Sequence, residues 1–119
     1  MRTHSTFVRR VVSISHVLDG HPLCGRLHGH ALTITAVIDG LPDVPDAFGA
    51  VATPAKLELI KGVINELNRR DLNTMIPAGY TSPNGVAAYL LERLTQLGVV
   101  EVSVEDETGN GARVRTLPS

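Results

Sequence analysis

Residues 24–39 read Cys-Gly-Arg-Leu-His-Gly-His-Ala-Leu-Thr-Ile-Thr-Ala-Val-Ile-Asp, and this stretch decides the fold. From Gly29 to Asp39 the apolar side chains recur at every second position, which predicts a strand with one buried face. His28 and His30 share the parity of those apolar residues, so both imidazoles point to the same face. The segment therefore predicts a strand that begins with polar ligands and continues into the core.

A first strand is predicted upstream, from Ser5 to His16, because its β-branched residues have the same two-residue period. Residues 17–27 contain Asp-Gly and proline and are typical of a loop. If the chain turns back in this loop, the end of the first strand lies beside the start of the second. His16 is then expected next to the histidines of the second strand.

Two helices are predicted downstream of residues 40–49, a connection that holds two prolines. Thr53 and Ser82 each precede a proline, and a capping hydroxyl followed by proline is a typical helix start. The first helix is expected to reach about Arg70, and the second to stop at Gly98. Apolar residues at helical spacing support the first helix, namely Leu57, Ile60, Ile64 and Leu67.

Two further strands are predicted at residues 100–104 and 112–116, separated by the turn at 109–111. The order ββααββ predicts an α+β fold, an antiparallel sheet with two helices on one face, as one domain over residues 1–119. Such a small sheet has bare edges, which must be paired or blunted. We therefore expect a homo-oligomer whose sheets join edge to edge.

The composition of the 119 residues is that of an ordinary globular chain, with 43% hydrophobic and 19% charged residues. A net charge of −1 argues against a nucleic-acid partner. The single cysteine excludes a disulfide within the chain and fits a cytoplasmic location. No apolar run is long enough for a membrane span or a signal peptide. We expect a cytoplasmic protein with a small-molecule partner.

Three histidines are placed to share one metal ion. His28 and His30 are two residues apart on a predicted strand, and His16 ends the strand expected beside it. A lone histidine on an apolar face is usually a hydrogen-bonded core residue, and His16 by itself would be interpreted in this way, but the spacing of the three favours a metal site. Three neutral nitrogen ligands with an open fourth position are typical of catalytic zinc, so we predict Zn²⁺.

Cys24 lies four residues before His28, in the loop that leads into the second strand. As a fourth ligand it would close the zinc site. As a thiolate beside the metal it would act as a base or nucleophile, because a nearby cation lowers the pKa of a thiol. Burial as a small apolar side chain is a third interpretation, which the flanking Pro22 and Gly25 disfavour. His21, in the same loop, is interpreted as a group behind the ligands, a proton carrier or a solvated side chain.

The pattern Cys-x-x-x-His-Gly-His, with a histidine that ends the strand before it, resembles the 6-pyruvoyl-tetrahydropterin synthase and 6-carboxy-tetrahydropterin synthase family. The order of strands and helices also matches that family's subunit, the T-fold. The resemblance implies a zinc-dependent lyase that acts on 7,8-dihydroneopterin triphosphate. It also implies a barrel-shaped homo-oligomer, commonly a hexamer of two trimers, with sites between subunits. The 6-carboxy branch, which serves 7-deazaguanine (queuosine-type) biosynthesis, is the more similar one.

Carried over position by position, the resemblance implies that His16, His28 and His30 hold the zinc and that Cys24 is the base. Zinc would polarise the side-chain oxygens of the substrate as a Lewis acid. The thiolate would remove a proton from the side-chain carbon as triphosphate leaves.

The resemblance also implies a pterin-binding site. The family has a glutamate followed by threonine that anchors the guanidine-like edge of the pterin, and a carboxylate suits two parallel donors. Glu107 matches because Thr108 follows it, whereas Asp106 matches by its distance from the last strand. We favour Glu107; the alternative for both acids is a solvated strand end. Thr81 resembles a family threonine whose backbone and hydroxyl contact the pterin.

One departure from the family concerns the proton relay. The family has an aspartate and a histidine after the first helix, and this chain has Asn68 and Arg69 there. Asparagine cannot accept a proton, and arginine is effectively always charged. Arg69 has three interpretations. In the first it is a cation that binds the triphosphate or a carboxylate product and lowers the pKa of Cys24, while His21 or water moves protons. In the second it indicates that the chemistry is lost or altered, and in the third Arg69 and Arg70 are cations at the end of a helix.

Overall fold

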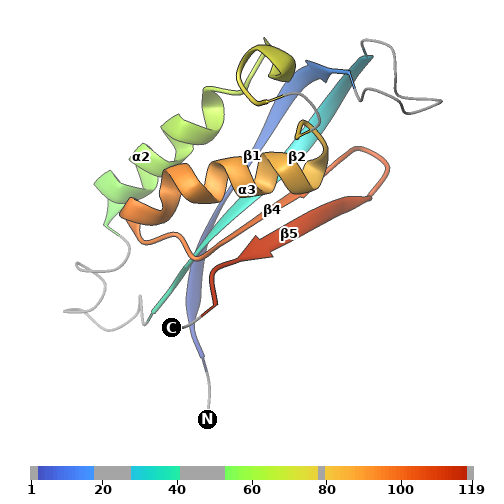
Figure 1. Cartoon of the computed structure of the whole chain (residues 1–119). Coiled ribbons are helices and arrows are strands. Elements are labelled where there is room, and N and C mark those ends of the chain that lie inside the picture. Colours follow the sequence, from blue (N-terminus) through green and yellow to red (C-terminus); the bar gives the residue numbers. More distant parts are fainter. Residues whose placement is uncertain (1–2, 18–27, 41–52, 78–79, 118–119) are drawn as a thin grey trace.

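Two long antiparallel strands, β1 (Ser5–His16) and β2 (His28–Asp39), form the centre of the sheet in Figure 1. The computed structural model describes residues 3–17, 28–40, 53–77 and 80–117. Within the strands, buried side chains recur at every second position as predicted, with the exposed Arg10 of β1 as an exception, because successive residues of a strand point to opposite faces. Both strand predictions are confirmed.

The sheet is mixed, with the strand order β3-β1-β2-β4-β5. β4 (Glu101–Glu105) pairs antiparallel with β2 and with β5 (Gly111–Arg115), as expected for the last two strands. β3 (Arg70–Asp71) lies parallel to β1 at the opposite edge. The expectation of a purely antiparallel sheet is therefore wrong at this edge, because a two-residue strand has no period that the sequence could reveal.

Both long helices begin where the sequence predicts. α2 (Pro54–Asn65) is capped by the Thr53 hydroxyl, and α3 (Pro83–Leu94) by the Ser82 hydroxyl; each oxygen accepts a backbone N–H of the first turn. In both helices proline occupies the first position, where its missing N–H has no helical partner to lose.

Two short 3₁₀ helices complete the described elements. η1 (Leu72–Thr74) follows β3, and η2 (Thr95–Leu97) extends α3. Gly98 then adopts a φ of 86°, in the left-handed region that favours glycine, and ends the helical segment as predicted.

α2 ends at Asn65, earlier than the predicted Arg70, because the following residues bind the edge of β1. The Asn68 Oδ1 accepts the Ser13 N–H at 3.0 Å, and the Arg69 N–H donates to the Ser13 carbonyl oxygen at 2.6 Å. Arg69 has a φ of 61°, outside the helical range. The interpretation of Arg69 and Arg70 as helix-end cations is therefore wrong, since neither is in the helix.

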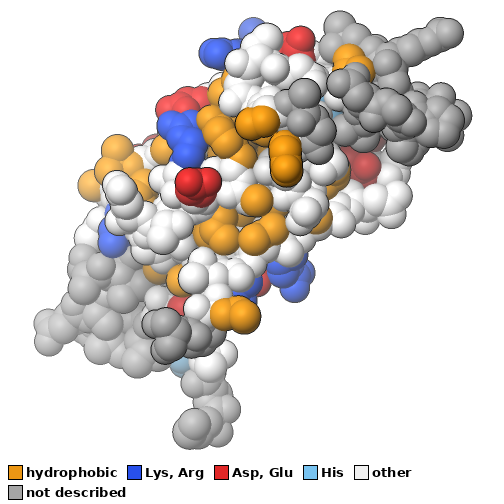
Figure 2. Space-filling view, in the orientation of Figure 1, with side chains coloured by type: hydrophobic (Ala, Val, Ile, Leu, Met, Phe, Trp, Pro, Cys, Tyr) orange, Lys and Arg blue, Asp and Glu red, His pale blue; other side chains and the backbone are white. Residues whose placement is uncertain are grey.

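α2 and α3 cover the same face of the sheet (Figure 1), and the core lies between the two layers. Fully buried aliphatic side chains come from both layers, for example Ile34, Val102, Ile60 and Leu90. On the face of the molecule shown in Figure 2, Lys and Arg side chains are interspersed with Asp and Glu. None of the helices in the described part of the chain is long and apolar enough to cross a bilayer.

Candidate metal centre

The register of β1 against β2 brings the three predicted histidines together. His16 pairs directly with His28, and His30 pairs with Ile14, two residues along β1. Residues opposite each other in an antiparallel pair point to the same face, so all three rings converge. The ring centroids are 4.5, 4.8 and 5.0 Å apart, each pair in an edge-to-face arrangement.

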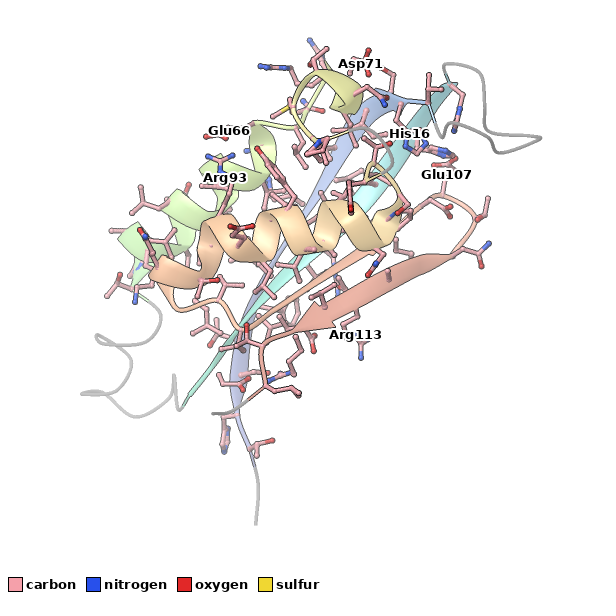
Figure 3. All side chains as sticks on the ribbon, in the orientation of Figure 1. His16, Glu66, Asp71, Arg93, Glu107 and Arg113 are labelled. Atoms are coloured by element: carbon pink, nitrogen blue, oxygen red, sulfur yellow. The ribbon has the colours of Figure 1, made fainter. Side chains whose placement is uncertain are left out.

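Each of the three histidines offers one nitrogen, and these atoms all lie within 4.8 Å of one another. The Nε2 atoms of His16 and His28 are 2.9 Å apart. The cluster lies at one end of the sheet, where β1 ends and β2 begins. Figure 3 shows His16 close to Glu107 at this end, with Asp71 nearby.

His16 is oriented by a backbone carbonyl. The residue is 4% exposed, and its Nδ1 lies 2.8 Å from the carbonyl oxygen of Thr81. Because a carbonyl only accepts, Nδ1 carries the proton and Nε2 presents its lone pair to the cluster. Burial, followed by the neighbouring His28 and His30, holds the pKa of His16 below its ordinary value of 6.5, although the Thr81 hydrogen bond acts in the opposite direction. The neutral ring is the form that binds metal.

His30 is held by a carboxylate. Its Nδ1 lies 2.6 Å from Oε1 of Glu107, whose other oxygen, Oε2, accepts the Ala31 N–H at 3.0 Å. The hydrogen bond with His30 lowers the pKa of Glu107 below its usual 4.5, so the carboxylate is ionised at neutral pH. His30 therefore donates from Nδ1 and keeps Nε2 for a ligand.

This donor set fits a divalent metal ion. Metal-bound histidines characteristically donate their second ring N–H to a carboxylate or a backbone carbonyl. His16 and His30 have one such partner each, from different parts of the fold. The three imidazoles of His16, His28 and His30 are thus the residues that could hold the ion.

The backbone just after His16 is clamped by two side chains that the sequence did not single out as positioning groups. The Asn73 amide accepts the Val17 N–H at 2.8 Å and donates to the Val17 carbonyl oxygen at 3.2 Å. The Thr81 hydroxyl also donates to that oxygen, at 3.3 Å. Thr81 is 1% exposed, and both its hydroxyl and its carbonyl oxygen form hydrogen bonds that hold the end of β1. Its contact with a pterin stays a prediction.

Asp106 and Glu107 have different roles in the β4–β5 hairpin. Asp106 Oδ1 accepts the Thr108 N–H and hydroxyl and the Asn110 N–H, which closes the turn on itself. The Thr108 hydroxyl is the main cause of the lowered pKa of Asp106. Glu107 instead reaches across to β2 and lies beside the histidines. Of the two acids, Glu107 is the one that joins the cluster.

The remaining predicted site residues are placed only in part. Arg69 is exposed, its backbone lies beside Ser13, and its side chain forms no hydrogen bond or ion pair with another described residue. Asn68, which the resemblance matches to the family's relay aspartate, accepts the Ser13 N–H of β1. Cys24 and His21 lie outside the described residues.

An open hollow of about 380 Å³ runs along the β4–β5 hairpin that carries Glu107. Residues of both strands and of the turn between them line it, among them Glu105 and Arg113. Gly111 allows the hairpin to close here, because a Cβ at this position would lie 2.0 Å from the Val104 carbonyl oxygen.

The fold and the histidine cluster define a T-fold with a candidate metal centre. Its structure is similar to that of 6-pyruvoyl tetrahydropterin synthase from Caenorhabditis elegans, with a TM-score of 0.80 and 18% identity over 98% of both chains. The Plasmodium falciparum 6-pyruvoyl tetrahydropterin synthase is similar with a TM-score of 0.67 and 14% identity, over 96% of this chain and 98% of that one. A catalytic-residue mutant of the Plasmodium vivax synthase has the same score and identity, over 98% and 99%.

No protein-family model matches the chain, and no curated protein sequence matches it at a significant level. The structural likeness covers almost the whole chain and confirms the family resemblance at the level of the fold. At these identities a likeness of folds does not define an activity.

Proposed function

We propose that this protein is a zinc-dependent lyase that converts 7,8-dihydroneopterin triphosphate to 6-carboxy-tetrahydropterin, in the cytoplasm and for 7-deazaguanine biosynthesis. The observation that carries the proposal is the convergence of three imidazoles at one end of a sheet with the fold of 6-pyruvoyl tetrahydropterin synthases. Two of these imidazoles are already held through their other nitrogen.

In this proposal each residue has a defined task. A bound zinc ion would supply Lewis acidity to the oxygens of the substrate side chain. The Cys24 thiolate accepts the proton from the side-chain carbon as triphosphate leaves, with His21 or water carrying it away. The ionised Glu107, with Asp106 fixing its turn, accepts two parallel N–H donors from the pterin edge, and Thr81 borders the pterin. Arg69, a permanent cation, binds the triphosphate.

A 6-pyruvoyl product is the alternative outcome at the same site. Zinc-loaded protein is incubated with 7,8-dihydroneopterin triphosphate while the pterin spectrum, triphosphate and acetaldehyde are followed. Equal amounts of triphosphate and acetaldehyde support the 6-carboxy product, because that route breaks a carbon–carbon bond. Triphosphate without acetaldehyde identifies the 6-pyruvoyl product. Pterin binding without either product contradicts the lyase and favours a non-catalytic zinc- and pterin-binding protein.

The Arg69→His variant separates an active enzyme from an impaired one. It restores the family's relay histidine at a position whose side chain is exposed. A large gain in rate means that the natural chain is an impaired lyase. An unchanged or lower rate, together with a higher KM for 7,8-dihydroneopterin triphosphate, means that Arg69 contributes to the natural site. Arg70→His, on the next residue, is the control.

We also propose that the protein is a homo-oligomer, with a hexamer as the expected form. In the described part of the chain β5 pairs only with β4, so its outer edge offers unpaired backbone groups. The sheet face away from the helices exposes Phe7 and Val11, with exposed fractions of 56% and 63%. Sedimentation velocity at micromolar concentration tests this, and a monomer contradicts it.

A further inference from the structure

The turn of the β4–β5 hairpin contacts β2 through the Glu107 side chain, at the candidate metal centre. Glu107 Oε1 lies 2.6 Å from His30 Nδ1, and Oε2 accepts the Ala31 N–H at 3.0 Å. The two oxygens of Glu107 therefore accept hydrogen bonds from the His30 ring and from the backbone N–H of the next residue, Ala31. This bidentate contact fixes both the position of the carboxylate and the rotation of the imidazole.

The turn that carries Glu107 is itself held by hydrogen bonds. Asp106 Oδ1 accepts three hydrogen bonds from Thr108 and Asn110, and the Asp106 N–H donates to the Asn110 carbonyl oxygen at 2.8 Å. The hydrogen bonds of the turn thus hold the Glu107 backbone in place beside His30. A ligand held in this way loses less rotational freedom when it binds an ion.

We propose that Glu107 is a positioning residue for the metal ligand His30, in addition to any contact with the pterin. Its carboxylate holds the Nδ1–H tautomer and directs Nε2 to the ion. An ionised carboxylate has about four acceptor sites, and the bonds to His30 and Ala31 use two of them. This inference rests on the metal binding in the proposed function and is independent of turnover.

The test measures metal affinity in the absence of any pterin. Zinc affinity of the full chain is determined by competition with a chromophoric chelator for the wild type, Glu107→Gln and Glu107→Ala. Glu105→Gln is the matched control, since it removes the same charge two residues away, from an exposed side chain on the same hairpin. We expect affinity to fall about 10- to 100-fold in the Glu107 variants and to stay near the wild-type value in the control.

A spectroscopic measurement separates positioning from a general structural effect. Each protein is saturated with Co²⁺, and its visible absorption is recorded. Loss of the carboxylate behind His30 is expected to shift the bands in the Glu107 variants and to leave those of Glu105→Gln unchanged. Equal zinc affinity and equal spectra in all four proteins overturn the inference.

Turnover of 7,8-dihydroneopterin triphosphate distinguishes this inference from the proposed function. If the Glu107 variants lose metal affinity while the wild type produces no triphosphate, the inference stands and the lyase proposal fails. If the wild type is active and Glu107→Gln keeps its metal affinity and its Co²⁺ spectrum but has a raised KM, the inference fails. Glu107 then serves the pterin alone.

Discussion

The Nδ1–H of His16 donates to the carbonyl oxygen of Thr81 across 2.8 Å, although the two residues are 65 positions apart. This contact ties the end of β1 to the segment that enters α3. It sets the tautomer of a candidate metal ligand through a backbone group, which no side-chain substitution at Thr81 removes. The conformation of the segment before α3 therefore matters for the metal centre.

Gly85→Ala is expected to disturb the His16 contact from a distance. A Cβ at Gly85 would lie 1.9 Å from the Tyr80 carbonyl oxygen, so the segment that holds Thr81 must move. We expect a loss of about 1–3 kcal/mol in the free energy of unfolding and weaker zinc binding. Chemical denaturation and chelator competition measure the two effects.

The control for that variant is Gly62→Ala, in the middle of α2. A Cβ there meets nothing within 4 Å, and alanine stabilises an exposed helix position by about 0.5–1 kcal/mol relative to glycine. Its zinc affinity should equal that of the wild type. Unchanged zinc affinity in Gly85→Ala would contradict the role given to the Thr81 carbonyl.

Removing any one imidazole should abolish stoichiometric metal binding. His16→Ala, His28→Ala and His30→Ala each leave two nitrogen ligands, so the loss of affinity should exceed the roughly 10- to 100-fold typical of residues behind the ligands. Metal content by atomic emission after dialysis measures it. His4→Ala, at an exposed position, should keep one ion per chain; the same content in all four variants would place the metal elsewhere.

Cys24→Ala is expected to abolish turnover and to leave the zinc content unchanged, because three histidines suffice as ligands while the thiolate accepts the proton. Triphosphate release and metal content are measured on the same preparation. If the zinc is lost together with activity, Cys24 is a fourth ligand. Full activity without the thiol would rule out its role as the base.

Acidification should destabilise the metal-free protein below about neutral pH. The pKa of His16 is lowered on folding from 6.5, mainly by burial, so the unfolded chain binds the proton more readily. The contribution of neutral His16 to the free energy of unfolding is therefore fully present above pH 6.5. It is lost as the pH drops from 6.5 toward the pKa of His16 in the folded protein. Thermal unfolding between about pH 8 and about pH 5 checks this. Stability that rises on acidification in this window would contradict it.

Glu107 is expected to cause a second loss of stability, at lower pH. Its pKa is lowered from 4.5 by the hydrogen bond with His30, so its contribution is lost only as the pH falls below 4.5. His16→Gln should remove the loss of stability that begins below pH 6.5 and should keep the loss that begins below pH 4.5. Glu107→Gln should do the reverse.

Much of the fold follows from local patterns in the sequence. The alternation from Ser5 to His16 and in β2 predicted two strands, and the hydroxyl–proline pairs predicted both helix starts. These signals are local because the period of a strand and the capping of a helix depend on residues only a few positions apart. The meeting of His16, His28 and His30 also followed, since an antiparallel pair of consecutive strands places the end of the first beside the start of the second.

The end of α2 was predicted wrongly for a tertiary reason. Leu67 keeps the helical spacing and is buried, so the pattern continues past Asn65. The Ser13 backbone, a neighbour only in the folded chain, offers a donor and an acceptor to Asn68 and Arg69, and the chain leaves the helix to bind them.

The sequence by itself determined the strand and helix order, the three histidines on one face and the resemblance to a pterin synthase family. Only the tertiary structure assigned the partners of those histidines, the Thr81 carbonyl for His16 and the Glu107 carboxylate for His30. It also separated Glu107 at the cluster from Asp106 in the turn. The reason is that periodicity reports which face a side chain occupies, whereas a hydrogen bond between residues 65 or 77 positions apart depends on how the layers pack.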